Sequence, residues 1–385
     1  MLTYSLTFTY LLTYHKYLTY SYCLPSFLLR FENDSNIARV IAANGVPTYE
    51  KCMQIFRQRP EVLRACMCGL SNAMYISDEN KLLIGQACGD EIVDIIFDHA
   101  SHLGLFKMAM RALGNLSVID ENVDKVIRCG ATRAIVAGMR HAPGEGEAML
   151  IAVQVMGNFA SAAEAIDEKY YDEPDGEEKM IAHIMFKEEA GPEVISVLNR
   201  SVAACEGHGG VISFRSLAGK EKQLLYACIE ALNFICHTTS VADALVPFGC
   251  CTIAAKSFRG AVADADVALL DPIVALLATL AYGDLCAMDL AIPSGGEKGV
   301  IEEILATLLE YPSQSGMLHN CMITLNLMVR HPPATSLYAA QRCFRPPFPP
   351  FPPLSFPLSF PLSRSTGSQL VLSPPFLPPP PPPPP

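Results

Sequence analysis

The sequence contains no tryptophan, and charged residues make up only 17% of its 385 positions, whereas half of the positions are hydrophobic. This composition excludes a chain that is disordered throughout, because disordered chains combine low hydrophobicity with high charge. The length corresponds to two or three domains or to one long repeat array. The averages hide uneven ends, since 18 of the 30 prolines follow position 345 and six of the 14 tyrosines precede position 23.

The local motifs of common enzymes and metal sites are also absent. The sequence has no G-x-x-x-x-G-K-[ST], G-x-S-x-G or H-E-x-x-H, which lowers the expectation of catalysis although triads can form from distant residues. The pairs Cys66-x-Cys68 and Cys250-Cys251 have no second pair at zinc-site spacing. Cysteine packs readily as a small buried hydrophobic residue. We therefore expect no catalytic residue, no cofactor and no metal.

The two ends differ from the rest of the chain. Residues 1–31 repeat Leu-Thr-Tyr and lack the apolar run and cleavage site of a secretory signal, so they are predicted to be a low-complexity extension. Residues 342–385 are predicted to be a disordered, proline-rich tail, because proline cannot join helix interiors or sheet ladders. The tail either binds a proline-reading module or is a translated pyrimidine-rich stretch outside the mature protein. Without a signal, the free cysteines indicate a reducing compartment, the cytoplasm or also the nucleus.

The region 32–341 holds all 39 acidic residues but only 23 of the 28 lysines and arginines, which gives it a formal charge of −16. A protein that binds nucleic acid must neutralise phosphates with basic side chains. The acidic balance therefore argues against a nucleic-acid partner. No membrane partner is expected either, because residues 1–31 dilute their leucines with polar side chains.

An internal repeat of 43 residues runs through the middle of the chain. Its anchors are GLSN ending at Asn72, ALGN at Asn115 and VMGN at Asn158, each preceded by apolar residues at helical spacing. Polar helix starts follow at Asp78 and Asp120. Breaks at Gly89 and Gly130 then separate a short helix from a second one, predicted at 91–99 and 132–141. Each unit is thus predicted to contain three helices.

The pattern extends in both directions. Asn233 and Asn326 match the anchor, and Leu280 fills the position between them. The irregular gap between Asn158 and Asn233 fits one unit plus inserted loops, including an acidic insert over 163–178. The predicted units are 32–76, 77–119, 120–162, 178–238, 239–284 and 285–331.

The strings CGLSNA, RALGNLS and QVMGNFA at the ends of the third helices resemble the armadillo repeat. The resemblance implies an all-α, right-handed solenoid of about six three-helix repeats whose third helices line a concave groove. It also implies that the anchor asparagines hold the backbone of an extended peptide, since an amide offers both a donor and an acceptor. The candidate groove residues are Asn72, Asn115, Asn158, Asn233 and Asn326. The alternative is that each amide caps or bridges a neighbouring loop.

The missing tryptophan separates this chain from the import adaptors that the armadillo family contains. Those proteins place tryptophan four residues before the asparagine to hold lysine side chains by cation–π contact. The equivalent positions here are Cys68, Arg111, Gln154, Ile229, Leu276 and Met322. A receptor for basic import signals is therefore not expected.

Basic residues on the first groove helices suggest a different ligand. Arg64, Lys107 and Arg111 precede their anchors by one or two helical turns, which favours an acidic or phosphorylated peptide. The alternative is that these side chains pair with nearby acids. The acidic segment 164–178 is predicted to be a solvated loop, with an autoinhibitory peptide as its alternative.

These observations predict a non-catalytic scaffold or adaptor that binds a partner protein or peptide in the groove of an armadillo solenoid. One alternative is a regulator or chaperone of a folded client of the small-GTPase or motor type, which would contact one edge of the solenoid. A second alternative is an unrecognised enzyme, which would need a deep pocket with convergent titratable groups.

Overall fold

The structure is a computed structural model that describes residues 34–75, 77–170, 176–207, 212–217, 219–291, 300–311 and 313–330. The regular elements in these ranges are helices, joined by short turns, with one isolated β-bridge between Glu206 and Ile212. The extensions predicted over 1–31 and 342–385 lie outside the described residues. The predicted all-α fold is confirmed for the part of the chain between them.

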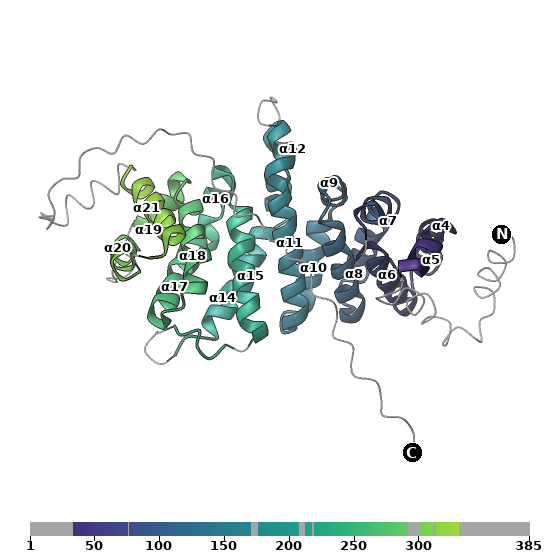
Figure 1. The fold of residues 1–385 in the computed structure, drawn as a ribbon, viewed down its shortest axis with the longest axis horizontal. Coiled ribbons are helices and arrows are strands. Elements are labelled where there is room, and N and C mark those ends of the chain that lie inside the picture. Colours follow the sequence, from purple (N-terminus) through teal and green to yellow (C-terminus); the bar gives the residue numbers. More distant parts are fainter. Residues whose placement is uncertain are drawn as a thin grey trace, which may run out of the picture.

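The helices form a row from α4 at one end to α21 at the other (Figure 1). The helices fall into six groups that correspond to the repeat. The first three groups are α4 (Asp34–Ala42), α5 (Gly45–Ile55) and α6 (Pro60–Tyr75); α7 (Asp78–Asp98) and α8 (Leu103–Leu116); and α9 (Asp120–Arg128), α10 (Ala131–His141), α11 (Gly146–Asp167) and the 3₁₀ turn η1 (Glu168–Tyr170). The last three groups are α12 (Gly176–Lys179), α13 (Ile181–Lys187), α14 (Ala190–Ala203) and α15 (Gly219–Ile235); α16 (Thr239–Ala244), η2 (Val246–Phe248), α17 (Cys250–Asp264) and α18 (Val267–Leu280); and α19 (Asp284–Ala291), α20 (Val300–Glu310) and α21 (Ser315–Arg330).

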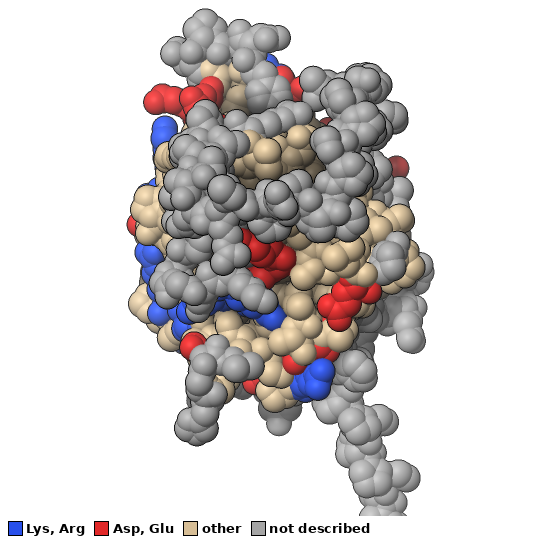
Figure 2. Space-filling model, turned by 90° about the vertical axis from the view of Figure 1, so that its left-hand side faces the viewer, with Lys and Arg blue, Asp and Glu red and all other residues tan. Residues whose placement is uncertain are grey.

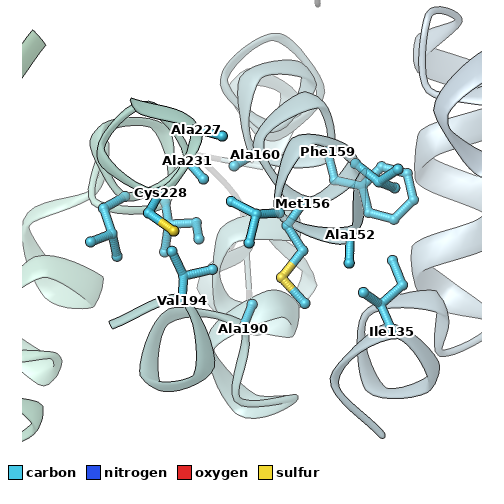
Figure 3. Close-up of a cluster of buried hydrophobic side chains, with 14 of the residues drawn as sticks. Ile135, Ala152, Met156, Phe159, Ala160, Ala190, Val194, Ala227, Cys228 and Ala231 are labelled. Carbon is cyan, nitrogen blue, oxygen red and sulfur yellow. The ribbon is translucent and has the colours of Figure 1, made fainter. Parts of the chain in front are cut away.

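The last helices of the groups, α6, α8, α11, α15, α18 and α21, pack in succession and form the spine of the row. A single apolar core follows them from Ile37 to Met328. At its centre α11 and α15 approach closely through small side chains, with Ala160 facing Ala227 and Ala231 (Figure 3). Because each group buries its apolar side only against its neighbours, the core is continuous along the row.

Helix α11 is apolar because it lies in the middle of this core. Together with η1 it is long and apolar enough to cross a membrane by length and composition alone. It packs between α8 and α15, however, and 61% of its most apolar window is buried within the protein. Met156 and Phe159 are fully buried there. Core packing therefore accounts for its composition.

The two glycines that predicted helix breaks behave differently. Gly130 has a φ of 90° and separates α9 from α10, as predicted. The break predicted at Gly89 is wrong, since α7 runs without interruption from Asp78 to Asp98. A Cβ on Gly89 would lie 3.2 Å from Val126, and one on Gly85 would overlap Asn122. These glycines allow α9 to approach α7 closely, which a sequence pattern cannot distinguish from a turn.

The acidic segment 164–178 is not simply a solvated loop, and the prediction is wrong for its first residues. Helix α11 extends to Asp167, which is completely buried. The Asp167 carboxylate accepts hydrogen bonds from the backbone N–H groups of Ile181 and Ala182 at the start of α13. Farther along, Glu177 pairs with His183 at 2.9 Å. Asp167 and Glu177 therefore make local contacts at the entry into α13.

The end of the row at α20 and α21 exposes large apolar side chains. Leu309 is 79% exposed, and Leu305, Met322 and Val329 are also exposed. In the view onto this end, much of the surface that is not grey is uncharged (Figure 2). Among the described residues, no further helix packs against the outer side of this last group.

Candidate protein-binding surface

The exposed sides of α6, α8, α11, α15, α18 and α21 form one continuous face, which we call the third-helix surface. The candidate asparagines occupy equivalent places on it. Asn115, for example, is partly exposed while its neighbours Gly114 and Leu116 are buried. Asn72, Asn158 and Asn233 are likewise partly exposed, and Asn326 in the last helix is exposed.

The amide nitrogens of Asn115 and Asn158 bridge adjacent helices of the spine. Nδ2 of Asn115 donates to the backbone oxygen of Ser71 at 2.9 Å and to its hydroxyl at 3.0 Å. Nδ2 of Asn158 donates to the hydroxyl of Ser117 at 2.9 Å. The bridging role that was the alternative to ligand binding is therefore present. The carbonyl oxygens of both amides remain without a partner among the described residues.

Asn233 forms its bridging hydrogen bond through the oxygen of its amide, not through the nitrogen. Its Oδ1 accepts a hydrogen bond from the Thr279 hydroxyl at 2.6 Å, so its Nδ2 stays available. Thr279 is partly exposed on α18, whereas Leu280 is completely buried. The assignment of Leu280 to the anchor position is thus wrong by one residue. A one-residue change rotates the side chain by about 100° around the helix, which separates surface from core.

The residues four positions before the anchors do not all face solvent. Cys68, Arg111 and Gln154 are partly exposed and Met322 is exposed, as groove residues should be. Ile229 and Leu276 are buried in the core, so these two positions do not correspond to the exposed tryptophan positions of import adaptors. Their apolar character was the available signal, since an exposed face favours polar side chains.

Two of the predicted basic residues, Lys107 and Arg111, lie on α8 beside acids at the start of α11. Nζ of Lys107 is 3.3 Å from Oε2 of Glu147 and 3.7 Å from Oε2 of Glu145. Arg111 is 3.5 Å from Oε1 of Glu147. The alternative interpretation, pairing with nearby acids, therefore holds for Lys107 and Arg111. Arg64 on α6 is exposed.

Glu147 lies among the basic side chains of this part of the third-helix surface. Burial acts to raise its pKa, but the hydrogen bond and charge of Lys107, with the charges of Lys220 and Arg111, lower the pKa overall. Lys220 lies at the start of α15, so basic groups surround Glu147 from two neighbouring helices. Lys107, Arg111 and Lys220 thus surround Glu147, and Lys107 also lies near Glu145.

Farther along the surface the charge has the opposite sign. Tyr226 and Glu230 lie on the exposed side of α15, about two turns and one turn before Asn233 respectively, and Asp271 is exposed on α18. Burial, together with the charge of Glu230 and a hydrogen bond to it, raises the pKa of Tyr226, and Asp271 adds to the effect. Helix α18 contains no lysine or arginine. The sequence reasoning missed this acidic, aromatic part because it searched only the predicted tryptophan positions.

No protein-family model matches the sequence, and no curated protein matches it. Solved structures do match. An engineered protein from a structural genomics programme gives a TM-score of 0.54 at 15% sequence identity, covering 74% of this chain and 97% of that chain. A designed armadillo repeat protein in complex with the peptide (KR)4 gives a TM-score of 0.52 at 16% identity, covering 74% of this chain and 99% of its own.

These neighbours confirm the predicted armadillo-type solenoid as the fold of this chain. Their identities to this chain are low, so the likeness concerns the arrangement of helices and carries no activity with it. Both are described as engineered or designed proteins rather than as enzymes.

Proposed function

We propose that this protein is a non-catalytic scaffold or adaptor that binds an extended segment of a partner protein along the third-helix surface. The observation that carries the proposal is the row of equivalent amides, in which Asn115, Asn158 and Asn233 each keep one hydrogen-bonding atom without a partner among the described residues. The designed armadillo neighbour, whose description includes a bound peptide, supports the same use of the fold.

The bridging hydrogen bonds favour this role because they fix each amide before a ligand arrives. With Nδ2 held by Ser71 or Ser117, the carbonyl oxygens of Asn115 and Asn158 can accept from peptide N–H groups. Asn233, held through Oδ1 by Thr279, can donate from Nδ2 to a peptide carbonyl. Side chains that are already ordered lose less conformational entropy on binding.

The charge distribution suggests which segment fits. An acidic or phosphorylated residue facing α6, α8 and α11 would replace Glu147 as the partner of Lys107 and Arg111. Lysine or arginine facing α15 and α18 would meet Glu230, Asp271 and the Tyr226 ring. We infer a partner segment whose charge changes sign along its length.

A displayed library of random peptides, selected against the full chain, tests the proposal. We expect enriched peptides whose affinity falls about tenfold when Asn115 and Asn158 are both changed to alanine, because two backbone hydrogen bonds are lost. The matched control is Asn199→Ala, an exposed amide on α14 away from the third-helix surface. Equal affinities for the double variant and the wild type would contradict the proposal. Binding only to folded domains would favour the alternative of a regulator or chaperone.

A further inference from the structure

Three cysteines that are far apart in sequence meet where α17 and α19 begin. Cys250 and Cys251 are the first two residues of α17, and Cys286 is in the first turn of α19. Their sulfur atoms all lie within 4.8 Å of one another, and those of Cys250 and Cys251 are 3.7 Å apart. In the sequence Cys250-Cys251 is an isolated pair, because spacing alone does not show that a thiol 35 residues away lies beside it.

The spacing suits a metal ion bound by thiolates. With Zn–S bonds of about 2.3 Å and tetrahedral angles, two sulfur ligands lie roughly 3.8 Å apart. The observed 3.7 Å between Cys250 and Cys251 agrees with that separation, and the 4.8 Å limit leaves Cys286 within a small side-chain adjustment. The thiols therefore need no backbone rearrangement to surround one ion.

The three thiols are closed off from solvent. All three side chains are buried, with at most 2% exposed. The first N–H groups of α19, those of Leu285 and Cys286, donate to the Asp243 carboxylate. The bound ion itself would therefore balance the charge of the thiolates.

A carboxylate lies beside the cluster on its solvent side. Asp289 follows Cys286 by three residues on α19, so both side chains lie on the same side of the helix. The Asp289 carboxylate is within hydrogen-bonding reach of the Cys251 thiol, and its residue is exposed. It can therefore act as a fourth oxygen ligand and mark the route by which an ion enters.

Ordinary core packing is the competing explanation, and the repeat allows a comparison. The positions equivalent to Cys250 and Cys251 are Ala131 and Thr132 at the start of α10, which are small and buried. Small residues without a thiol therefore satisfy the packing, and three clustered thiols exceed that requirement. The Cys286 thiol donates to the Ala242 carbonyl at 3.2 Å, a bond that a metal ion would replace.

We propose that Cys250, Cys251 and Cys286 bind one Zn²⁺ through their thiolates, with Asp289 as the fourth ligand. The ion joins the second helix of one group to the first helix of the next. Since α20 and α21 expose apolar side chains at the end of the row, such a link stabilises the group with the least packing. This inference is independent of peptide binding on the third-helix surface.

The test uses the full chain, stripped of metal under reducing conditions and titrated with Zn²⁺ against a chromogenic chelator. We expect one equivalent to bind, and Co²⁺ used as a probe to give a thiolate charge-transfer band. Cys286→Ser should weaken Zn²⁺ binding at least tenfold and reduce that band. Asp289→Asn should weaken Zn²⁺ binding while the band remains. Cys228→Ser, at a completely buried cysteine of α15, is the matched control and should bind as the wild type does.

A measurement on the unmutated chain guards against variants that fail to fold. Zn²⁺ should slow alkylation of Cys250, Cys251 and Cys286 at least tenfold, as read by mass spectrometry, and should leave the rate at Cys228 unchanged. Absence of stoichiometric binding, a Co²⁺ spectrum without thiolate bands, or equal protection of Cys228 would overturn the proposal. Retention of full Zn²⁺ affinity in Asp289→Asn would overturn the assignment of the fourth ligand.

Discussion

The two halves of the third-helix surface share a backbone plan but differ in charge. Around Glu147 at the start of α11 lie Lys107 and Arg111 of α8 and Lys220 at the start of α15. Farther along α15 and on α18, the surface presents Tyr226, Glu230 and Asp271. Bridging hydrogen bonds of the same kind occur in both halves, from Asn158 in one and to Asn233 in the other. In a solenoid each repeat contacts only its neighbours, so surface charge can vary from repeat to repeat while the packing is kept.

The largest expected effect lies at the junction of the two halves. Asp167→Ala removes the acceptor of the Ile181 and Ala182 amides, and we expect it to lower the free energy of unfolding by about 3 kcal/mol. Urea unfolding followed by circular dichroism should show this loss and a smaller m-value, because the halves then unfold separately. The control is Glu164→Ala, an exposed acid on the same helix.

Asp167→Asn should cost about half as much as Asp167→Ala in the same measurement. The N–H groups of Ile181 and Ala182 donate to different oxygens of the carboxylate, and an amide keeps only one of these acceptors. Burial raises the pKa of Asp167 despite the two backbone hydrogen bonds, so the loss of the negative charge itself should add little to that cost. A loss as large as that of Asp167→Ala would show that the charge itself, paired with His237 or Arg128, joins the halves.

Reversing one charge in either half of the third-helix surface should change which charged peptides bind there. Glu230→Lys should weaken binding of the peptide (KR)4 about tenfold, which corresponds to about 1.4 kcal/mol, and should leave an all-glutamate peptide of equal length unaffected or better bound. Arg111→Glu should have the converse effect. Fluorescence anisotropy at low salt measures both, since added salt screens such exposed charges. If both variants changed both peptides equally, the division of the surface would be wrong.

The bridging amides should differ modestly in stability. Asn158→Ala leaves the buried Ser117 hydroxyl with only its bond to the Gly114 carbonyl, and we expect a loss of about 1 kcal/mol. Asn233→Ala should cost less, because Thr279 is partly exposed and water can replace the lost bond, whereas Ser117 is buried. Chemical denaturation of the two variants side by side gives the comparison, and the reverse order would contradict it.

The smallest effect is a difference in pH dependence between two acids. The folded-state pKa of Glu147 is lowered, so its contribution is present above the unfolded pKa and is lost as pH falls through the folded pKa. Burial raises the pKa of Glu230, so its ionised form is disfavoured in the fold and its contribution to stability improves as pH falls through the raised value. Comparing Tm near pH 4 and pH 7 for Glu147→Gln and Glu230→Gln should show shifts of opposite sign, each worth only a few tenths of a kcal/mol because both groups are partly solvated.

Most of the fold could be predicted from the sequence, because the spacing of the repeat follows from the way the helix groups pack. The 43-residue spacing of Asn72, Asn115 and Asn158 follows from one helix group stacking on the next. The site was predictable only in part. Asn115 and Asn158 lie on the surface as expected, but Leu280 and Ile229 are buried, since small register changes between repeats exchange surface and core.

The sequence by itself therefore determined the helical repeat, the anchor positions where the motif is regular, and the uncharged, cysteine-bearing core. These properties depend on local periodicity, which is present in the sequence whatever the tertiary contacts are. Tertiary structure alone decided that Glu147 would meet Lys107, that Asp167 would be buried at the start of α13, and that Cys286 would join Cys250 and Cys251. Each of these contacts links residues from different helices, and only the packing of those helices sets the distance between them.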